Sequence, residues 1–396
     1  MFSKIASSIQ PSITLSISAK AKAMKAKGED VIGFGAGEPD FDTPSDIKEK
    51  AKEAIDKGFT KYTPASGLPQ LKEAIADKFK RDNDLVYQKD QIFVGCGAKH
   101  VIFEILFALV QKGDEVIIPA PFWVSYPEMV KLTQARSVFI PAKEKDNFKI
   151  TAEALDRHIT AKTKVIILNS PSNPTGAVYS KKELGSLAKV IKKRKIFCIS
   201  DEIYEKLIYD GAEHISIASL SQSLKEKTIV VNGVSKTYSM TGWRIGYAAG
   251  PKEVIRIASN VQSHTTSNPA SISQFASIQA LKGPQEEVYR MRDEFKKRRD
   301  YLVDRVNSIK GISCRKPQGA FYSFVNISKA LGKKIGAKTV EGSVAFCELL
   351  LEKEKVAAVP GIAFGDDSFI RISYATSMRN LEKGLDRIER FIGDLS

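Results

Sequence analysis

The chain has 396 residues, of which 43% are hydrophobic and 27% are charged, a composition typical of a globular protein large enough for two domains. Its formal net charge of +15 raises the question of a nucleic-acid partner. The lysines are spread along the chain, however, and no basic block alternates with aromatic residues as a nucleic-acid groove requires. No apolar run is long enough to span a membrane. We therefore expect neither nucleic acid nor a membrane as a partner.

Cysteines and histidines are few and scattered. The four cysteines show no paired spacing and the four histidines are isolated in the sequence. This pattern predicts no disulfide framework and no bound metal, and it fits a reducing compartment. Residues 1–28 lack acidic residues, as transit peptides do, but they also lack arginine. We expect a mature N-terminal arm with a short helix over 18–27, and hence a cytoplasmic protein.

Two loops rich in proline and glycine separate the first predicted elements. The loop over 35–44 follows a short strand at 31–34, and the loop over 61–67 contains Tyr62. Helices are predicted over about 45–57, with Ser45 or Asp46 as the cap, and over 68–80.

A turn of small residues at 95–100 separates a predicted strand at 91–94 from an apolar helix that reaches Val110. Free backbone N–H groups at the start of such a helix suit a phosphate. The glycine spacing matches neither a P-loop nor the dinucleotide-binding fingerprint. Small residues also permit close packing of the strand on the helix, so the turn alone leaves both interpretations open.

Polar and aromatic residues follow the next predicted strands, where ligands collect in open α/β sheets. Trp123 follows the strand at 115–119, and Asn173 lies in a rigid turn after the apolar run at 164–168. Asp201 and Tyr204 follow the strand at 196–199. These side chains could face one ligand, with Trp123 stacking on a flat ring. Ordinary core packing by the aromatic residues and helix capping by Asp201 explain the same positions.

Lys236 follows the apolar run at 228–231, and Arg244 precedes a second apolar run at 245–249. A lysine at the end of a buried strand can have a depressed pKa and react with carbonyl groups. Ser235 and Arg244 offer donors that suit a phosphate. On this stretch alone, a solvated loop with a chance lysine is an equally good interpretation.

Strands alternate with helices over residues 45–290, which predicts a mostly parallel, doubly wound α/β sheet as the large domain. Residues 291–396 predict a smaller α+β domain, which we expect the N-terminal arm, residues 1–44, to join. Its strands are expected at 320–324 and 368–374, and its helices at about 286–307, 343–353 and 378–392.

Taken in order, these motifs resemble the class I aminotransferases of the fold-type I pyridoxal-phosphate family over nearly the whole chain. The resemblance is closest to the aspartate aminotransferase branch (subgroup Ib), which includes aspartate/prephenate aminotransferases. Each motif alone is weak, whereas the ordered set is specific. The motifs are Gly37–Phe41, Tyr62, Pro121–Pro127, Asn173–Gly176, Ser200–Tyr204, Ser235–Gly246 and Arg371.

The resemblance implies a catalytic role for Lys236, which would hold pyridoxal 5'-phosphate through its amine and move the proton of the substrate Cα. Asp201 would pair with the pyridine nitrogen of the cofactor, and Tyr204 and Asn173 would bind its ring oxygen. Trp123 would stack on the ring. The phosphate would be held by Gly97, Ala98, Lys99, Ser235 and Arg244, and by Tyr62 of the neighbouring subunit in a homodimer with shared active sites.

For the substrate, the resemblance implies that Arg371 and Gly37 hold the α-carboxylate beside Trp123 and Asn173. A guanidinium matches a carboxylate in a bidentate fork. Thr14 and Lys99, with Ser12 nearby, would take the distal carboxylate of a dicarboxylic substrate. Capping of a helix by Ser12 and solvation of Lys99 explain those residues equally well on chemistry alone.

The expected reaction is therefore L-aspartate plus 2-oxoglutarate to oxaloacetate plus L-glutamate, with transamination of prephenate to arogenate as a further activity. Alternatives within the fold are an aromatic or alanine aminotransferase, or a lyase such as an aminocyclopropane-carboxylate synthase. The alternative from another class is a non-catalytic protein that binds a ligand or nucleic acid. Six polar residues argue against this alternative, since a protein without catalytic activity does not need them all. They are Lys236, Asp201, Tyr204, Asn173, Arg244 and Arg371.

Overall fold

The computed structural model describes residues 2–11 and 13–396, except for the side chains of residues 13–15 and 18. The larger part of the molecule is built on a seven-stranded sheet. The strand order is β2-β8-β7-β6-β5-β3-β4. Strands β3 to β7 run parallel, and β8 is inserted antiparallel between β2 and β7. The mostly parallel sheet predicted from the sequence is confirmed. Its strands are β2 (Ile92–Gly95), β3 (Glu115–Ala120), β4 (Arg136–Pro141), β5 (Thr163–Asn169), β6 (Phe197–Asp201), β7 (Thr228–Gly233) and β8 (Gly246–Ala249).

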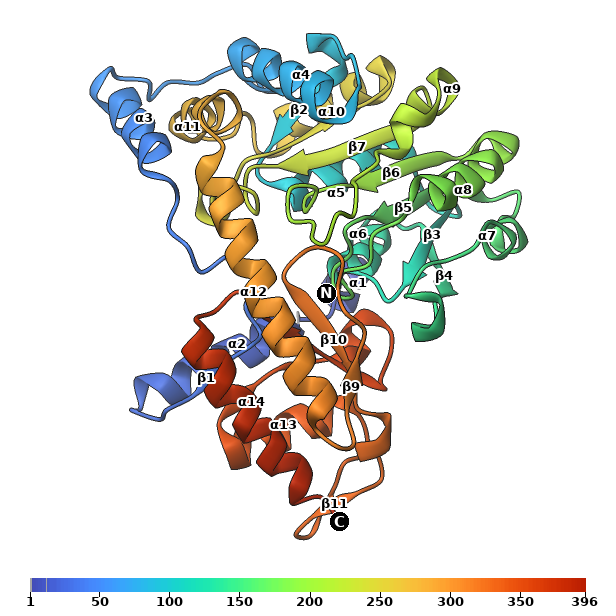
Figure 1. The fold of residues 1–396 in the computed structure, drawn as a ribbon. Coiled ribbons are helices and arrows are strands. Elements are labelled where there is room, and N and C mark those ends of the chain that lie inside the picture. Colours follow the sequence, from blue (N-terminus) through green and yellow to red (C-terminus); the bar gives the residue numbers. More distant parts are fainter. Residues whose placement is uncertain (1, 12) are drawn as a thin grey trace.

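Helices cover both faces of this sheet, because successive residues of a buried strand point to opposite faces and are apolar on both. On β5, for example, Val165 and Ile167 face one helix layer while Ile166 and Leu168 face the other. The sheet is therefore doubly wound (Figure 1). One layer holds α5 (Ala98–Leu109), α6 (Ser125–Leu132) and α10 (Lys252–Thr265), and the other holds α3 (Ser45–Asp56), α4 (Pro69–Asn83), α8 (Lys181–Arg194) and α11 (Ser271–Lys282).

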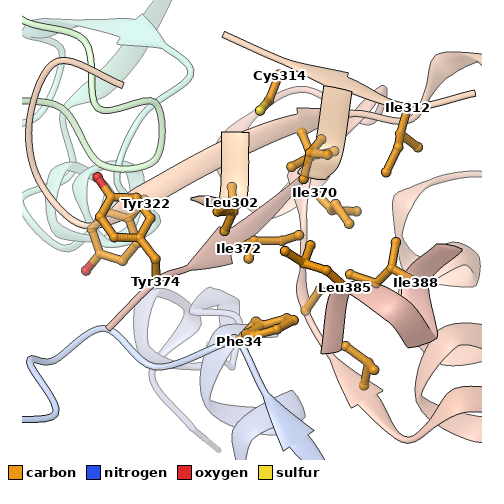
Figure 2. Close-up of a cluster of buried hydrophobic side chains, with 14 of the residues drawn as sticks. Phe34, Leu302, Ile312, Cys314, Tyr322, Ile370, Ile372, Tyr374, Leu385 and Ile388 are labelled. Carbon is orange, nitrogen blue, oxygen red and sulfur yellow. The ribbon is translucent and has the colours of Figure 1, made fainter. Parts of the chain in front are cut away.

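A second, antiparallel sheet has the strand order β14-β15-β10-β9. Its strands are β9 (Ser313–Cys314), β10 (Tyr322–Asn326), β14 (Val359–Pro360) and β15 (Phe369–Ser373). Side chains from this sheet and from α12 (Glu286–Ser308), α13 (Ser343–Glu354) and α14 (Met378–Gly393) form one apolar core. Figure 2 shows part of that core, with Tyr322 of β10 at one side of it.

The long helix α12 connects the two parts (Figure 1). Val288, near its start, packs in the core of the large sheet, and Leu302 packs in the core of the second sheet. The domain boundary that we predicted at residue 290 falls inside this helix and stays a prediction. Near the N-terminus, β1 (Ile32–Gly33) pairs in parallel with β13 (Val356–Ala357) and so ties the start of the chain to the C-terminal part.

The N-terminal arm contacts both parts of the molecule. Helix α2 (Ile13–Ala26) packs beside β13 through Ala21. The assignment of the arm to the second domain stays a prediction. Helix α1 (Lys4–Ser8) lies instead against α6, where the ammonium group of Lys131 donates a hydrogen bond to the Ser8 carbonyl. Pro11 separates the two helices and disfavours helical backbone at the residue before it, so α1 and α2 can take different directions.

Helix α3 begins at Ser45, as predicted, but its capping residue differs from the sequence prediction. Pro44, and not Ser45 or Asp46, occupies the N-cap, and no side chain caps the helix. Asp46 lies in the first turn, and its carboxylate accepts a hydrogen bond from Gln279 at 3.0 Å. Proline is already restricted to a backbone angle compatible with a helix start, which explains the shift. Among the described helices, none is both long enough and apolar enough to cross a membrane.

A buried polar cluster supports the segment that follows β6. Glu205 is buried and forms a salt bridge with Lys78 of α4, and Asn83 donates to its other oxygen at 2.9 Å. Glu202 accepts a hydrogen bond from His214 at 2.9 Å, and two serine hydroxyls occupy its other oxygen. Burial opposes charge on Glu205, but Lys78 and His214 hold its pKa below the usual range. The cluster therefore fixes the chain on either side of Tyr204 through paired charges.

We predict that Lys78→Met destabilises the fold by about 3–5 kcal/mol, because it leaves Glu205 buried without its counter-ion. Urea titration of the protein freed of ligands measures the change in the free energy of unfolding. The double variant Lys78→Met/Glu205→Gln should recover most of the loss, since the remaining group is neutral. Lys80→Met on the exposed side of α4 is the matched control, and a Lys78→Met variant as stable as this control would contradict the prediction.

Candidate active site

A cavity of about 330 Å³ lies at the carboxyl ends of β5 and β6, between the large sheet and the second sheet. The carboxyl edge of a parallel sheet is where such sites form, because the loops that leave the strands converge there. Eleven of the residues predicted from the sequence line this cavity. They are Gly37, Ala98, Lys99, Trp123, Asn173, Asp201, Tyr204, Ser235, Lys236, Arg244 and Arg371.

Four predicted residues are placed differently. Gly97 lies directly behind the Arg244 guanidinium and does not line the cavity itself. Tyr62 is 92% exposed on the loop between α3 and α4. Thr14 belongs to α2, but its side chain is outside the described part of the structure, and Ser12 lies outside the described residues altogether.

Lys236 follows β7 and extends its amine across the cavity. Its Nζ donates a hydrogen bond to the Gly37 carbonyl at 2.6 Å. Burial lowers the pKa of Lys236 to about 8; Glu38 opposes this shift, whereas the positive charges of Arg244 and Arg371 add to it. An amine with this pKa is partly neutral near pH 7 and can attack a carbonyl carbon.

Asp201 ends β6, and its carboxylate is held by two donors. Tyr126 donates its hydroxyl hydrogen to Oδ2 at 2.6 Å, and the Ile203 amide donates to Oδ1 at 3.3 Å. Burial raises the pKa of Asp201 to about 6, although the Tyr126 hydrogen bond opposes the shift. The Tyr126 ring also contacts Trp123 edge to face, with ring centroids 5.3 Å apart. Tyr126 therefore orients both a carboxylate and an aromatic ring of the cavity.

The turn before α5 has the geometry of an anion cradle. Gly97 has a φ of 89°, and a Cβ there would lie 2.4 Å from an Arg244 guanidinium nitrogen. A Cβ at Gly246 would lie 2.2 Å from the Ala98 nitrogen, so glycine at this position lets β8 approach the turn. The Ala98 and Lys99 amides precede the first helical hydrogen bond, from the Val101 amide to the Gly97 carbonyl at 3.1 Å. Free amides, a helix N-terminus and a nearby guanidinium together suit a phosphate.

Three positive charges of the cavity have no carboxylate partner among the residues that the structure describes. Arg371 is 3% exposed and donates to Asn173 at 3.0 Å and to the Gly35 carbonyl at 2.9 Å, while its Nε has no hydrogen-bond partner in the described part of the chain. Burial lowers the pKa of Arg371. Within the described residues, no carboxylate forms a salt bridge with Arg371, Lys99 or Arg244. The cavity therefore favours a ligand, or a pair of ligands, with several anionic groups.

Among the lining residues that were not predicted from the sequence, three carry polar side chains: Tyr126, Asn169 and Tyr322. Tyr126 lies within the Pro121–Pro127 motif, but the direction of its side chain depends on α6, a helix that the sequence did not predict. Tyr322 was assigned to a strand without a role, and its hydroxyl lies 3.0 Å from that of Tyr204. Asn169 donates to the Asp201 carbonyl at 2.9 Å and accepts from the Asn173 amide at 2.8 Å. The position of Asn169 directly after the apolar run at 164–168 was the available sequence signal for this residue.

The whole arrangement matches a known family. The family model described as aminotransferase class I and II matches residues 29–388. The chain belongs to this family.

Relatives and solved structures agree with this assignment. The chain is 52% identical over 384 residues to an aspartate aminotransferase of a Bacillus species, covering 97% of each chain. It is 51% identical over 391 residues to a probable aspartate/prephenate aminotransferase of Rickettsia felis, covering 98% of this chain and 96% of the relative. The crystal structure of an aspartate aminotransferase from Rhizobium meliloti superposes with a TM-score of 0.97 at 46% identity, covering 100% of both chains. That from Thermus thermophilus with maleate superposes with a TM-score of 0.92 at 40% identity, covering 98% of this chain and 99% of the other.

We predict that Lys236 of the cofactor-free aminotransferase becomes reactive at lower pH than an exposed lysine. Competitive acetylation followed by peptide mass spectrometry should place its midpoint near pH 8, below the ordinary lysine value of about 10.4, with the exposed Lys80 labelled in the same experiment as the control. Glu38→Gln should lower the midpoint further, because the carboxylate of Glu38 raises the Lys236 pKa. A Lys236 midpoint equal to that of Lys80 would show that burial does not depress this pKa.

Proposed function

We propose that this protein is a pyridoxal-phosphate-dependent aspartate aminotransferase, which converts L-aspartate and 2-oxoglutarate to oxaloacetate and L-glutamate. One observation carries the proposal. Lys99, Arg244 and Arg371, three cationic side chains with no carboxylate partner among the described residues, line the same cavity as the nucleophilic amine of Lys236. A phosphate and the two carboxylates of an amino-dicarboxylic acid would supply the three anions that this cavity lacks.

The residues present fit the cofactor in both charge and shape. The Gly97–Lys99 turn, Ser235 and Arg244 would hold its phosphate, and the indole of Trp123 would cover its ring. Asp201 would accept a hydrogen bond from the protonated pyridine nitrogen, and Tyr204 with Asn173 would bind the ring oxygen. When bound, pyridoxal phosphate supplies an electron sink for negative charge at the substrate Cα.

The chain's own residues would then move and hold protons. Lys236 would bind the cofactor covalently and, once displaced by the substrate, carry the Cα proton as general base and then as general acid. Asp201 would keep the pyridine nitrogen protonated, because a buried carboxylate favours a neighbouring cation. Its loss should therefore reduce the rate of the chemistry more than the affinity for the cofactor.

The substrate carboxylates would be divided between two parts of the molecule. Arg371 of the second sheet would take the α-carboxylate in a bidentate fork, with the Gly37 backbone beside it. Lys99 at the start of α5 would take the distal carboxylate. Maleate, named with the Thermus thermophilus structure, is itself a dicarboxylate, which agrees with this division. The assignment of Thr14 and Ser12 to the distal carboxylate remains a prediction.

A homodimer would complete the site. Tyr62 is 92% exposed, and Ile55 and Phe59 nearby are 53% and 41% exposed. Exposed apolar side chains clustered around a loop favour a protein–protein contact. In the proposed dimer this surface meets a second copy, and Tyr62 reaches the phosphate bound by the neighbouring subunit. Light scattering should give twice the chain mass of 43.7 kDa.

Prephenate is a second amino-group acceptor that we propose. The rickettsial relatives are named as probable aspartate/prephenate aminotransferases at about 50% identity. Prephenate carries two carboxylates, so the same pair of cations could bind it. An aromatic or alanine aminotransferase is less well supported, because neither substrate would need the distal cation at Lys99.

The first test is to mix the purified protein, loaded with pyridoxal phosphate, with aspartate and record the visible spectrum. Aspartate should bleach the absorbance of the bound cofactor, and 2-oxoglutarate or prephenate should restore it, because the two half-reactions run in opposite directions. A response to phenylalanine or alanine but not to aspartate would support the proposed cofactor and refute aspartate as the substrate. A protein that takes up no pyridoxal phosphate would overturn the proposed function.

We further predict that Lys99→Ala raises the KM for aspartate by about 10- to 100-fold, as expected for the loss of a charge-assisted hydrogen bond. The KM for alanine should change little, because alanine has no distal carboxylate. Alanine at position 99 keeps the backbone amide that faces the phosphate. Steady-state kinetics with both amino acids measure the ratio, with Lys89→Ala as the exposed control. Equal changes for both substrates would refute a distal-carboxylate role.

A further inference from the structure

Tyr322 on β10 lines the cavity and has no role in the proposed reaction. It is fully buried, and its side chain contacts two groups that do have proposed roles. The Arg371 guanidinium carbon lies 4.3 Å from the centre of its ring, and the Tyr204 hydroxyl lies 3.0 Å from its own hydroxyl. One side chain thus connects the proposed carboxylate site with the proposed cofactor site.

Aromatic rings, and not a carboxylate, flank the buried guanidinium. Besides Tyr322, the ring of Phe364 lies 5.1 Å from the Arg371 guanidinium carbon. The pairing of β10 with β15 places these groups, because Arg371 is directly opposite Phe324, two residues from Tyr322. Such diagonal neighbours on one face of an antiparallel pair are within reach of aromatic and long side chains.

This arrangement has a chemical consequence for ligand binding. A carboxylate partner would stabilise the buried cation but would also occupy the N–H groups that a substrate needs. The face of an aromatic ring attracts a cation through its quadrupole and leaves the N–H groups at the edge of the guanidinium free. Asn173 and the Gly35 carbonyl take one N–H each, and no described residue accepts a hydrogen bond from Nε. Arg371 therefore keeps donor capacity for an incoming anion.

The hydroxyl group of Tyr322 makes a separate contact. If Tyr204 donates its own hydrogen to a bound cofactor oxygen, the hydrogen between the two tyrosines must come from Tyr322. A hydroxyl that accepts one hydrogen bond becomes a better donor in another, so the Tyr322 hydroxyl would strengthen the contact made by Tyr204.

We propose that Tyr322 is a positioning residue with two separable actions, which rests on the proposed aminotransferase function. Its ring holds the Arg371 guanidinium in place for the substrate α-carboxylate. Its hydroxyl donates to Tyr204 and so adjusts the hydrogen bond that Tyr204 makes to the cofactor oxygen.

Two substitutions separate these actions in the protein loaded with pyridoxal phosphate. Tyr322→Phe removes the hydroxyl and keeps the ring, whereas Tyr322→Leu removes both. Calorimetry measures the dissociation constant of maleate, a dicarboxylate that cannot react, and a pH titration of the visible absorbance reports the hydrogen bonding of the cofactor oxygen. Maleate affinity should stay within twofold in Tyr322→Phe and fall about 5- to 30-fold in Tyr322→Leu, or roughly 1–2 kcal/mol.

The spectroscopic readout should change in both variants. Loss of the Tyr322 hydroxyl weakens Tyr204 as a donor, so the deprotonated chromophore is less stabilised and the midpoint of the absorbance titration rises. Phe364→Leu is the matched control: it removes the second ring from the guanidinium and no hydroxyl. It should weaken maleate binding and leave the titration midpoint unchanged. It also tests the ring action independently if Tyr322→Leu does not fold.

The outcomes distinguish this inference from the proposed function. A wild-type protein that neither binds maleate nor responds to aspartate would overturn both. A wild-type protein that does both, together with ring-removal variants that bind maleate as tightly as wild type, would overturn the positioning of Arg371 alone. An unchanged titration midpoint in Tyr322→Phe would overturn the action of the hydroxyl.

Discussion

Buried positive charge, with no carboxylate paired to it in the part of the chain that the structure describes, is the constraint on which the rest of this structure depends. A guanidinium as buried as that of Arg371 normally has a carboxylate partner, and here burial depresses its pKa instead. The amine of Lys236 shows the same effect, with a pKa lowered to about 8. In both cases the fold disfavours the charged form until an anion arrives. The same property makes the cavity selective for anions and keeps the lysine partly neutral.

The scaffold holds these charges through elements that are remote in sequence. Lys236 and Asp201 leave adjacent parallel strands, so a rigid sheet sets their relative position. Arg371 comes from the second sheet, and the helix α12, packed in both cores, connects the two sheets. Beneath the cavity, the paired charges of Lys78 and Glu205 fix the segment that carries Tyr204. Rigid strands and a satisfied polar network are what a preorganised site requires.

Two buried tyrosines orient the polar and aromatic groups of the cavity. Tyr126 contacts both Asp201 and Trp123, and Tyr322 contacts both Arg371 and Tyr204. Each tyrosine combines a flat apolar face with a hydroxyl, so one buried residue can orient two neighbours of different chemistry. Neither tyrosine ionises easily, because burial raises the pKa of both. Both hydroxyls therefore stay protonated: that of Tyr126 donates to the Asp201 carboxylate, and that of Tyr322 shares a hydrogen bond with the Tyr204 hydroxyl.

The sequence by itself determined the class of fold, the order of most strands and helices, and eleven residues of the cavity. Apolar runs followed by polar residues are local signals, and the ordered motifs around Lys236 are specific to a family. Only the tertiary structure decided the rest. The roles open to Tyr126 and Tyr322 depend on which way side chains point across α6 and across the β10–β15 pair, and pairing register is not a local property of the chain. The placement of α1 on α6 and the position of Pro44 as the N-cap of α3 were likewise decided by contacts and backbone restrictions that compete with local propensity.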